Sequence, residues 1–576
     1  MSSGKAFYKF LLISVLMEFA LFFPLYISRS EEGKFWPVLT SIPGSLVSRA
    51  NPDVFRWCLE LGLFFSLYLF FARRLNSIWP NVAMSFIYFL LMLFQLYYFI
   101  LWKIYGEIPV FSYDWALFER VLPVFMKTLQ IPALLFYSIL TLLAVSLIYI
   151  LFKCFTLIHL FAKQISSAAK LAYLSLVFLF PAFLKTVVPH PIESNDTKSA
   201  ILWISENFHK TISRTRVHAL PDSIDCTPYQ FFAGLPLKSK PNILLIFIEA
   251  YGSVLGCVSP YDADYFAQLN EIENNLALAG WKSATTLSNS TILGGRSWLG
   301  FTSLIAGIKI DNHPAYEKLI NKFPDYPHLI NTLNAQGYHT YRLNTMSNFG
   351  EDFKIIDSIA GNFFNINSDW TKFNSIPYQG YRYDYFGGIP DQYALNYWNE
   401  NVLNKNKTPY FLFFITLNTH APFYLPPPIL ANWKDLDAIK TSPHKRIRAE
   451  TGKPIERYAQ EVKYILSTLE QFILNKADSN TLILLIGDHQ PAGMEYMING
   501  KTDLYANPMH VITKDPKWIS LLIDHGFAQG MVPKLEKPSL LNHQQIYSFL
   551  MNMWAVHDSL DYKIEILKDG LHLVNQ

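Results

Sequence analysis

The sequence predicts an N-terminal helical membrane domain followed by a soluble α/β domain with a mainly parallel sheet. Two observations lead to this prediction. Apolar residues crowd into the first 190 of the 576 positions, whereas the later positions alternate short apolar runs with amphipathic stretches. The chain is also 51% hydrophobic and 16% aromatic, with a mean hydropathy of +0.16, which is more apolar than an average soluble protein.

The membrane domain is expected over residues 1–190, with about five spanning helices. Each expected span supplies roughly the 20 apolar residues that cross the core of a bilayer. The first span lacks a cleavage-site pattern and contains Glu18, so we expect a retained anchor rather than a signal peptide. The spans are expected at about 8–28, 55–72, 81–102, 131–152 and 169–187.

Charges in the connecting loops predict the orientation of these spans. The N-terminus, the short loop at Arg73 and Arg74, and the connection over 153–170 carry basic residues and no acids. The longer loops near 29–54 and 103–130 mix both signs. Because short basic loops face the cytoplasm, five spans place everything after about residue 190 outside it.

Net charge and cysteine content exclude some functions. The net charge of +3 gives no electrostatic reason to expect nucleic-acid binding. The four cysteines Cys58, Cys154, Cys226 and Cys257 follow no metal-binding spacing. Cys226 and Cys257 could pair in an oxidising compartment, and we expect that they do not.

Residues 191–240 read as a polar connector, and the soluble domain is expected over 241–576. Four apolar runs predict strands that are buried on both faces, as parallel sheets require. Between the last two, Tyr458, Val462, Ile465, Leu469 and Phe472 repeat at helical spacing, which predicts a crossover helix over 455–473. The strands are expected at 242–250, 338–344, 411–417 and 482–488.

Polar side chains follow each of these strands. In parallel α/β sheets, functional groups gather beyond the carboxyl ends of the strands. Two carboxylates and two imidazoles are therefore expected at one edge, together with a guanidinium and an amide. They are Glu249 after the first strand, Arg342 and Asn344 at the second, His420 after the third, and Asp488 with His489 after the fourth.

Two carboxylates and a histidine form a suitable mixed site for one divalent ion, manganese or zinc. The reactive group is expected at Ser297, which opens an apolar helical segment. Gly294 and Gly295 permit a tight turn near a phosphate, and Arg296 adds a positive charge. Each residue alone also fits a structural role, such as a helix cap or a loop ion pair. Their joint placement at strand ends favours chemistry.

The stretches "NILLIFIEAYG", "GGRSWLGF", "FLFFITLNTHAPF" and "LILLIGDHQ" occur in an order that resembles the sulfatase-like branch of the alkaline phosphatase superfamily. With the preceding spans, the chain resembles membrane-anchored transferases of phospholipid headgroups. These include lipoteichoic acid synthases, phosphoglycerol transferases and phosphoethanolamine transferases. The resemblance implies that Glu249, Ser297, Asp488 and His489 hold the metal, with Ser297 as nucleophile.

The resemblance further implies substrate contacts from His420, Arg296 and His510. It implies a phospholipid donor, a glycan or glycolipid acceptor of the cell envelope, and a covalent phosphoserine intermediate. The protein would then lie in a bacterial inner membrane, with the catalytic domain on the periplasmic side. Three alternatives stay open: a hydrolase, in which water replaces the acceptor; a sulfatase; and a non-catalytic sensor or scaffold that keeps the fold.

The sequence also departs from this family. Ser297 is followed by "WLGF" and lacks the Pro and Arg of the sulfatase signature C/S-x-P-x-R, which disfavours a formylglycine sulfatase. The nucleophile of the resembling transferases is more often Thr. The lipoteichoic acid synthases carry a Trp-x-Arg pair where residues 346–354 read "MSNFGEDFK", so the headgroup is left open.

Overall fold

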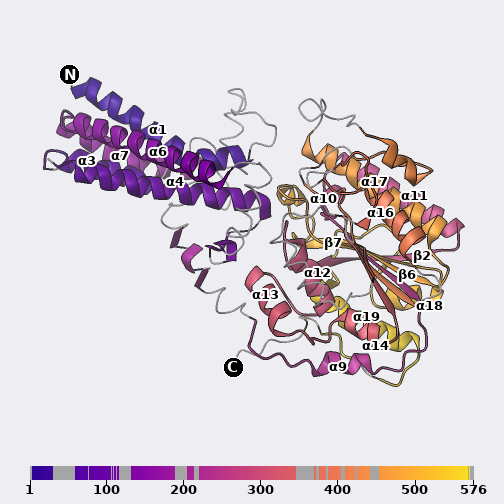
Figure 1. Ribbon diagram of the computed structural model, residues 1–576. Helices are drawn as coiled ribbons and strands as arrows, with labels where there is room; N and C mark the ends of the chain where they lie inside the picture. Colours follow the sequence, from indigo (N-terminus) through magenta and orange to yellow (C-terminus); the bar gives the residue numbers. More distant parts are fainter. Residues whose placement is uncertain are drawn as a thin grey trace. The chain divides into compact units, whose positions relative to one another are not determined.

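The computed structural model divides into two compact units by their internal contacts (Figure 1). One comprises Met1–Lys103 and Glu107–Arg216, and the other comprises Ile104–Gly106 and Val217–Gln576. Cys58 and the 346–354 stretch lie outside the described residues. The structure describes residues 3–29, 59–74, 77–105, 107, 109–111, 113–115, 132–187, 204–205, 207–209, 211–212, 220–345, 363, 369–371, 375–383, 387–403, 409–421, 423, 426–440, 453–562, 564–567 and 570.

The first unit contains a helix at each of the five expected spans. Within its described residues, two helical stretches are long and apolar enough to cross a membrane, Trp79–Trp102 and Ala133–Ala162. The prediction of five spans is therefore not confirmed as a whole and stays a prediction. The helices are α1 (Ser3–Arg29), α3 (Leu59–Phe71), α4 (Trp79–Tyr105), α6 (Ala133–Ala162) and α7 (Ser167–Val187).

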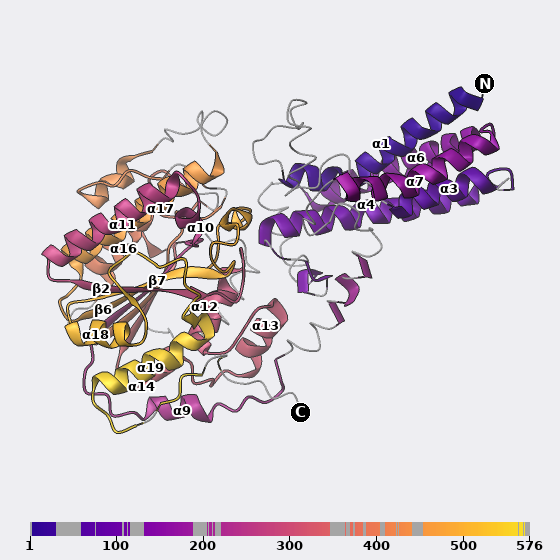
Figure 2. The same ribbon diagram turned by 180° about the vertical axis from the view of Figure 1, so that it is seen from behind.

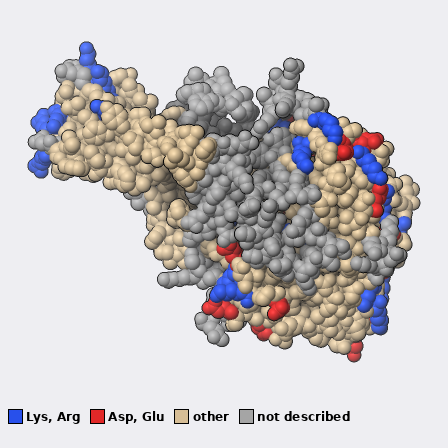
Figure 3. All heavy atoms as spheres, in the orientation of Figure 1, with Lys and Arg blue, Asp and Glu red and all other residues tan. Residues whose placement is uncertain are grey.

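The surface of these helices is apolar. Only 22% of the apolar window of α4 and 6% of that of α6 is buried, so neither is the core helix of a soluble protein. Leu134 and Leu142 on α6, for example, are 82% and 67% exposed. On the face shown in Figure 3, the Lys and Arg residues of the helical unit lie at the end with the N-terminus, and the rest of the described surface of this unit is almost uncharged.

The segments expected in the cytoplasm lie at one end of the helical unit. The N–H of Ser166, between α6 and α7, donates to the hydroxyl of Ser3 over 2.9 Å. Lys170 donates to the carbonyl of Leu69, near the end of α3. The three short basic segments are therefore close together, as one cytoplasmic side requires.

The predicted connection over 153–170 is wrong in extent. Helix α6 continues to Ala162 and α7 begins at Ser167, so the two helices are separated by 163–166. Lysine is a good helix former, and Lys153 lies with its ammonium 5.2 Å from the centre of the Tyr149 ring. A single charge therefore marks no helix end here.

The second unit alternates strands and helices. Its strands are β1 (Asn242–Ile248), β2 (Lys282–Asn289), β3 (His339–Leu343), β4 (Asp369–Thr371), β5 (Tyr410–Ile415), β6 (Thr481–Gly487), β7 (Ala506–Thr513), β8 (Ala528–Gln529) and β9 (Leu541–Asn542). Its α-helices are α9 (Thr227–Ala233), α10 (Val254–Cys257), α11 (Tyr261–Leu278), α12 (Ser297–Ala306), α13 (His313–Lys322), α14 (Leu329–Ala335), α16 (Asp391–Tyr397), α17 (Pro454–Lys476), α18 (Pro516–Asp524) and α19 (Ile546–His557). Short π or 3₁₀ turns are η4 (Trp398–Val402), η5 (Trp433–Ala438), η7 (Glu495–Ile498) and η8 (His543–Gln545).

The described strands form one mixed sheet in the order β4-β3-β5-β1-β6-β7-β2-β8, with β9 beside β2. Strands β4, β3, β5, β1 and β6 run parallel to one another, which confirms the four predicted strands and the mainly parallel sheet. The antiparallel contacts of β7 with β6 and β2 were not predicted. Strand β1 lies between β5 and β6. The three strands that precede Glu249, His420 and Asp488 are therefore adjacent in the sheet.

Helices cover both faces of this sheet (Figures 1 and 2). Alternate residues of β1 point to opposite faces, as the pleat of a strand requires. Leu245 and Phe247 join a core with α12, α14, α18 and α19, whereas Leu244 and Ile246 join a core with α10, α11, α16 and α17. The unit is therefore an α/β/α sandwich. The crossover helix α17 matches its predicted range.

Residues 220–240, which the sequence assigns to the connector, pack against the α/β unit. Tyr229 on α9 is fully buried and donates to the carbonyl of Gly307 over 2.5 Å. Cys226 and Cys257 are both free thiols, as expected. The predicted boundaries at residues 190 and 240 stay a prediction.

Candidate metal centre and nucleophile

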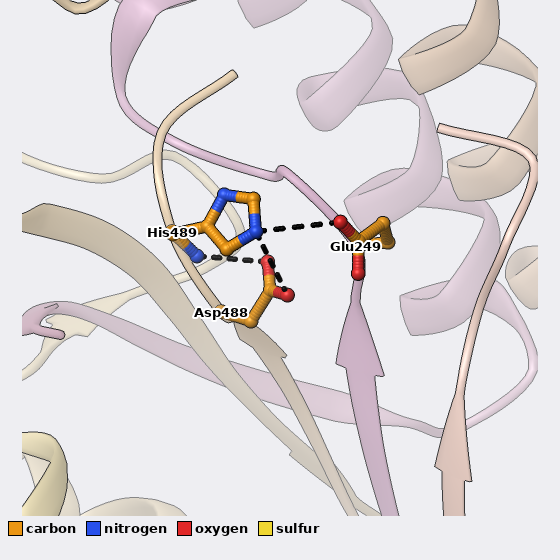
Figure 4. A group of neighbouring side chains, drawn as sticks. All are labelled: Glu249, Asp488 and His489. Atoms are coloured by element: carbon orange, nitrogen blue, oxygen red, sulfur yellow. Dashed lines mark hydrogen bonds and ion pairs between the residues drawn. The ribbon is translucent and has the colours of Figure 1, made fainter. Parts of the chain in front are cut away.

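Two strand ends bring together Glu249, Asp488 and His489 (Figure 4). Glu249 follows β1, and Asp488 with His489 follows β6. The register pairs Ile248 with Gly487, so Glu249 and Asp488 leave the sheet side by side. A Cβ at Gly487 would lie 1.9 Å from the Tyr251 carbonyl oxygen, so only glycine permits this approach of the two chains.

The side chains of this trio converge in a buried space. His489 Nε2 lies 3.3 Å from Glu249 Oε1 and 3.5 Å from Asp488 Oδ2. One potential ligand atom from each residue lies within 4.8 Å of the others. All three residues are at most 4% exposed. Such a set of oxygen and nitrogen atoms is suited to one divalent ion.

The remaining polar atoms of the trio are fixed by the main chain. Asp488 Oδ1 accepts from the N–H groups of Ala250 and His489 over 2.7 and 2.8 Å. The Nδ1 of His489 binds the carbonyl of Gln490 over 2.7 Å, which leaves Nε2 for a ligand. Asp488 Oδ2 is buried and accepts no hydrogen bond from a described residue. A buried carboxylate oxygen without a hydrogen-bond donor, beside an imidazole nitrogen that faces two carboxylates, fits a bound cation.

Burial and the short distances between Glu249, Asp488 and His489 shift the pKa values of all three side chains. Burial and then the charge of Glu249 raise the pKa of Asp488 to about 8. Burial alone would raise the pKa of Glu249, but the hydrogen bond and charge of His489 lower it to about 2. Burial disfavours the imidazolium of His489, yet Asp488 and Glu249 together raise its pKa to about 9. The trio thus attracts positive charge, which a divalent ion supplies more fully than protons do.

Ser297 lies directly beside the trio. Its hydroxyl donates to Glu249 Oε2 over 3.0 Å and lies 3.1 Å from His489 Nε2. It is the first residue of α12, as the sequence predicts, and Arg296 occupies the N-cap position without a side-chain cap bond. The serine is therefore not the helix cap, and its hydroxyl points to the trio instead.

The turn before Ser297 is strained. Gly295 and Arg296 both have a positive φ, of 57° and 59°. Arginine rarely adopts this left-handed conformation, and such strain gathers at functional sites. The turn ends at the N-terminus of α12, where main-chain N–H groups favour an anion.

His420 faces the trio from the loop after β5. Its Nε2 lies 3.9 Å from Glu249 Oε1, and its Nδ1 binds the carbonyl of Ala421 over 2.6 Å. The side chain is 25% exposed, so it lies at the open edge of the buried trio. The structure therefore brings together Glu249, Ser297, His420, Asp488 and His489.

The other residues predicted to contact substrate are Arg342, Asn344 and His510. Arg342 lies buried within β3, and the N–H of Asn344 donates to the Thr371 carbonyl just beyond the strand. His510 lies fully buried in β7, where its ring nitrogens bind the hydroxyls of Tyr251 and Thr285 over 3.1 and 2.8 Å. These bonds favour a supporting role for His510. The predicted substrate contacts of all three residues stay a prediction.

Two buried histidines predict acid sensitivity of the α/β unit. Burial lowers the pKa of His328 to about 4 and that of His510 to about 3. The unfolded chain protonates both near pH 6.5, so it binds more protons than the folded chain below that value. Stability should fall as the pH drops from about 6.5 toward the folded pKa values, by up to about 1.4 kcal/mol per pH unit for each histidine. Thermal unfolding across this range, compared between wild type and His328→Gln, checks this; an equal pH slope in both contradicts it.

Sequence reasoning missed the residues that support the trio. The hydroxyl of Thr416 accepts from the N–H of Glu249 over 3.1 Å, and the hydroxyl of Tyr458 donates to the Ala250 carbonyl over 2.7 Å. Thr416 lies within an apolar run, and Tyr458 fits the buried face of the crossover helix. Hydrophobic periodicity places such residues in a core but gives no signal for the bond that a hydroxyl makes there.

The chain was compared with known proteins. Residues 241–516 match the family model for sulfatases. No curated protein matches the chain. Among solved structures, it is similar to the lipoteichoic acid synthase LtaP from Listeria monocytogenes, with 14% identity and a TM-score of 0.38 over 60% of this chain and 81% of that one.

Two further solved structures are similar at the same identity. The C-terminal periplasmic domain of EptC from Escherichia coli, in complex with Zn, has 14% identity and a TM-score of 0.36, over 60% of this chain and 87% of that one. The phosphoglycerol transferase GacH from Streptococcus pyogenes, in complex with sn-glycerol-1-phosphate, has 14% identity and a TM-score of 0.35, with the same coverage of both chains.

The family match includes every residue of the candidate site. Glu249, Ser297, His420, Asp488 and His489 all fall within the matched residues, as do strands β1 to β7. The family that the sequence resembles is thereby confirmed for this part of the chain. Residues 241–516 form a domain of the sulfatase family.

Proposed function

We propose that this protein is a metal-dependent membrane enzyme that transfers a phospho-headgroup from a phospholipid to a glycan or glycolipid of the cell envelope. The headgroup is phosphoglycerol or phosphoethanolamine, by the resemblance of the sequence motifs. The observation that carries the proposal is the Ser297 hydroxyl, which lies 3.0 Å from Glu249 and 3.1 Å from His489 within a buried group of metal-binding side chains. A hydroxyl in such a place is suited to act as a nucleophile.

Glu249, Asp488 and His489, together with Ser297, would hold one divalent ion, manganese or zinc. When bound, this ion would neutralise charge on a phosphoryl group and lower the pKa of the Ser297 hydroxyl. The Oδ2 of Asp488, which accepts no hydrogen bond from a described residue, and the Nε2 of His489, which faces both carboxylates, support this assignment.

The proposed reaction has two steps. Ser297 Oγ forms a bond to the phosphorus of the donor, and the bond from phosphorus to the diacylglycerol oxygen breaks. The hydroxyl proton, which is hydrogen-bonded to Glu249 Oε2, passes to solvent as the bond to phosphorus forms. The leaving diacylglycerol oxygen takes up a proton from solvent. The oxygen of an acceptor hydroxyl then bonds to the phosphorus and loses its proton to solvent. The bond from phosphorus to Ser297 Oγ breaks, and Oγ takes up a proton to restore the serine.

We expect several groups to bind phosphoryl oxygens in this reaction. The main-chain N–H groups at the start of α12 would favour an anion at Ser297, and Arg296 would add positive charge from the preceding turn. The Nε2 of His420 lies at the open edge of the trio, 3.9 Å from Glu249 Oε1, where we propose that it contacts the phosphoryl group. We propose substrate contacts for Arg342 and Asn344 from their place at the end of a predicted strand, and for His510 from the resemblance of the motifs.

The helical unit supports a membrane location. Helices α4 and α6 expose apolar windows long enough to cross a bilayer, and the three short basic segments lie at one end. We therefore assign residues 1–190 to an inner-membrane domain, 191–240 to a connector and 241–576 to a catalytic domain on the periplasmic side. Such an anchor would keep the site close to lipid.

The proposal is tested with the full chain in vesicles of phosphatidylglycerol or phosphatidylethanolamine. Metal-dependent release of diacylglycerol, together with labelled headgroup on an added glycolipid, is the expected result. Release of free headgroup at the same rate with and without acceptor would identify a hydrolase instead. Turnover of sulfate esters without turnover of any phosphodiester would contradict the proposal.

Replacing Arg296 with glycine should lower turnover without destabilising the fold. Glycine adopts a φ of 59° freely, whereas a residue with a Cβ loses roughly 1 kcal/mol there. The variant should unfold at the same or a higher temperature, while turnover falls by about 10²-fold because a charge on the phosphoryl group is lost. Thermal unfolding and diacylglycerol release measure both effects. Arg296→Lys, which keeps charge and strain, is the matched control, and full activity of Arg296→Gly would contradict the role of Arg296.

A further inference from the structure

A buried carboxylate holds the loop that carries His420. Asp391 begins α16 and is fully buried. Both of its oxygens accept from the N–H of Leu417 over 3.0 Å, and Oδ2 also accepts from the N–H of Asn418 over 2.9 Å. In return, Asn418 Oδ1 accepts from the N–H of Asp391 over 2.8 Å. The two segments are thus tied by reciprocal bonds.

The same loop joins both sides of the candidate site. Thr416, immediately before it, accepts from the N–H of Glu249 over 3.1 Å. The N–H of His420 donates to the carbonyl of Leu417 over 3.0 Å, so the position of His420 follows from that of Leu417. A shift of residues 416–420 would therefore move the His420 ring relative to Glu249.

The acceptor of these hydrogen bonds is a carboxylate, that of Asp391, and not a neutral group. Hydrogen bonds to an ionised group are shorter and stronger than neutral ones. A buried carboxylate is retained at a cost in desolvation, and here it is satisfied by main-chain N–H groups of one particular loop. These strong hydrogen bonds from the N–H groups of Leu417 and Asn418 to Asp391 therefore hold the loop that carries His420.

We propose that Asp391 is a positioning residue, which fixes the loop of residues 416–420 and thereby sets the position of His420 against the phosphoryl group. This proposal rests on the proposed function for its effect on turnover. The fixing of the loop itself does not depend on the substrate. The two parts can therefore be tested separately.

The first test measures hydrogen exchange in the full chain for wild type, Asp391→Asn and Asp435→Asn. The side-chain amide introduced by Asp391→Asn would present a donor to N–H groups that need an acceptor, so faster exchange is expected in peptides covering 411–421. Peptides covering 481–489 should be unchanged. Asp435, in the exposed part of η5, is the matched control and should leave both sets unchanged. Unchanged exchange over 411–421 in Asp391→Asn would overturn the proposal, whatever the substrate.

The second test is a double-mutant cycle on turnover of a chromogenic phosphodiester and of phospholipid. Asp391→Asn should lower kcat by about 10-fold or more, with little change in metal content. If Asp391 acts through His420, the same change made in His420→Ala should cost almost nothing further. Equal costs in both backgrounds would show a general structural effect and overturn the positioning role.

A third variant, Asn418→Ala, tests the same proposal if Asp391→Asn folds poorly. Asn418→Ala removes the reciprocal bond and keeps the carboxylate, so a smaller effect of the same kind is expected. Failure of wild type to turn over any phosphodiester would contradict the proposed function, while the hydrogen-exchange result would still decide whether Asp391 fixes the loop.

Discussion

Replacing Ser297 with alanine is expected to abolish turnover and leave the fold intact. The hydroxyl is the only part of the side chain removed, and it donates to Glu249 within the metal-binding trio. Without it no covalent intermediate forms, so a loss of at least about 10³-fold in kcat is expected. Diacylglycerol release from phospholipid vesicles measures this loss. Thermal unfolding should change little, because Ser297 makes no cap bond in α12.

Ser297→Thr is the matched control for this substitution. Threonine keeps the hydroxyl, and the resembling transferases more often use threonine at this position, so part of the activity should remain. Full activity of Ser297→Ala would contradict the assignment of the nucleophile. Loss of activity in both variants with unfolding of both would point to a packing role for this position.

Replacing His489 with alanine is expected to remove the bound metal and the activity together. In the proposed site His489 would supply the nitrogen ligand through Nε2, because its Nδ1 is bonded to the carbonyl of Gln490. Loss of a ligand of this kind weakens metal binding strongly, so the metal content after desalting should fall from near one equivalent to a small fraction. Elemental analysis measures the content, and kcat should fall by at least about 10²-fold.

His420→Ala is the matched control for the metal measurement. Its Nε2 lies 3.9 Å from Glu249 Oε1, at the edge of the trio rather than within it. This variant should keep its metal and lose part of its turnover. Treatment with a chelator should inactivate the wild type, and added manganese or zinc should restore it. An unchanged metal content in His489→Ala would contradict the ligand assignment.

The fold was predictable where the apolar pattern is unambiguous. The predicted strand at 482–488 matches β6 within one residue, because a run of large aliphatic residues ending in glycine suits a strand buried on both faces. The crossover helix was predictable from Tyr458 and its helical repeats. The antiparallel β7 was not, because its central His510 interrupts the apolar run and sequence does not specify the direction of a neighbouring strand.

The residues of the candidate site that lie at strand ends were predictable from the sequence. The residues that hold them in place through hydrogen bonds were not. Glu249 and Asp488 lie at the carboxyl ends of two predicted strands, so their proximity follows if these strands are parallel neighbours. The strained turn at Arg296 was indicated only through Gly294 and Gly295. Asp391 gave no signal, because its role depends on main-chain N–H groups of a segment 26 residues away in the chain. Such a contact is visible only in three dimensions.

The covalent intermediate is the central claim, and intact-mass measurement of the full chain tests it most directly. The protein would be incubated with its metal and with vesicles of phosphatidylglycerol or phosphatidylethanolamine, then quenched in acid. We expect an added mass equal to phosphoglycerol or phosphoethanolamine, located by peptide mapping at Ser297 and absent from Ser297→Ala. An adduct on another residue, or full turnover by Ser297→Ala, would contradict the mechanism.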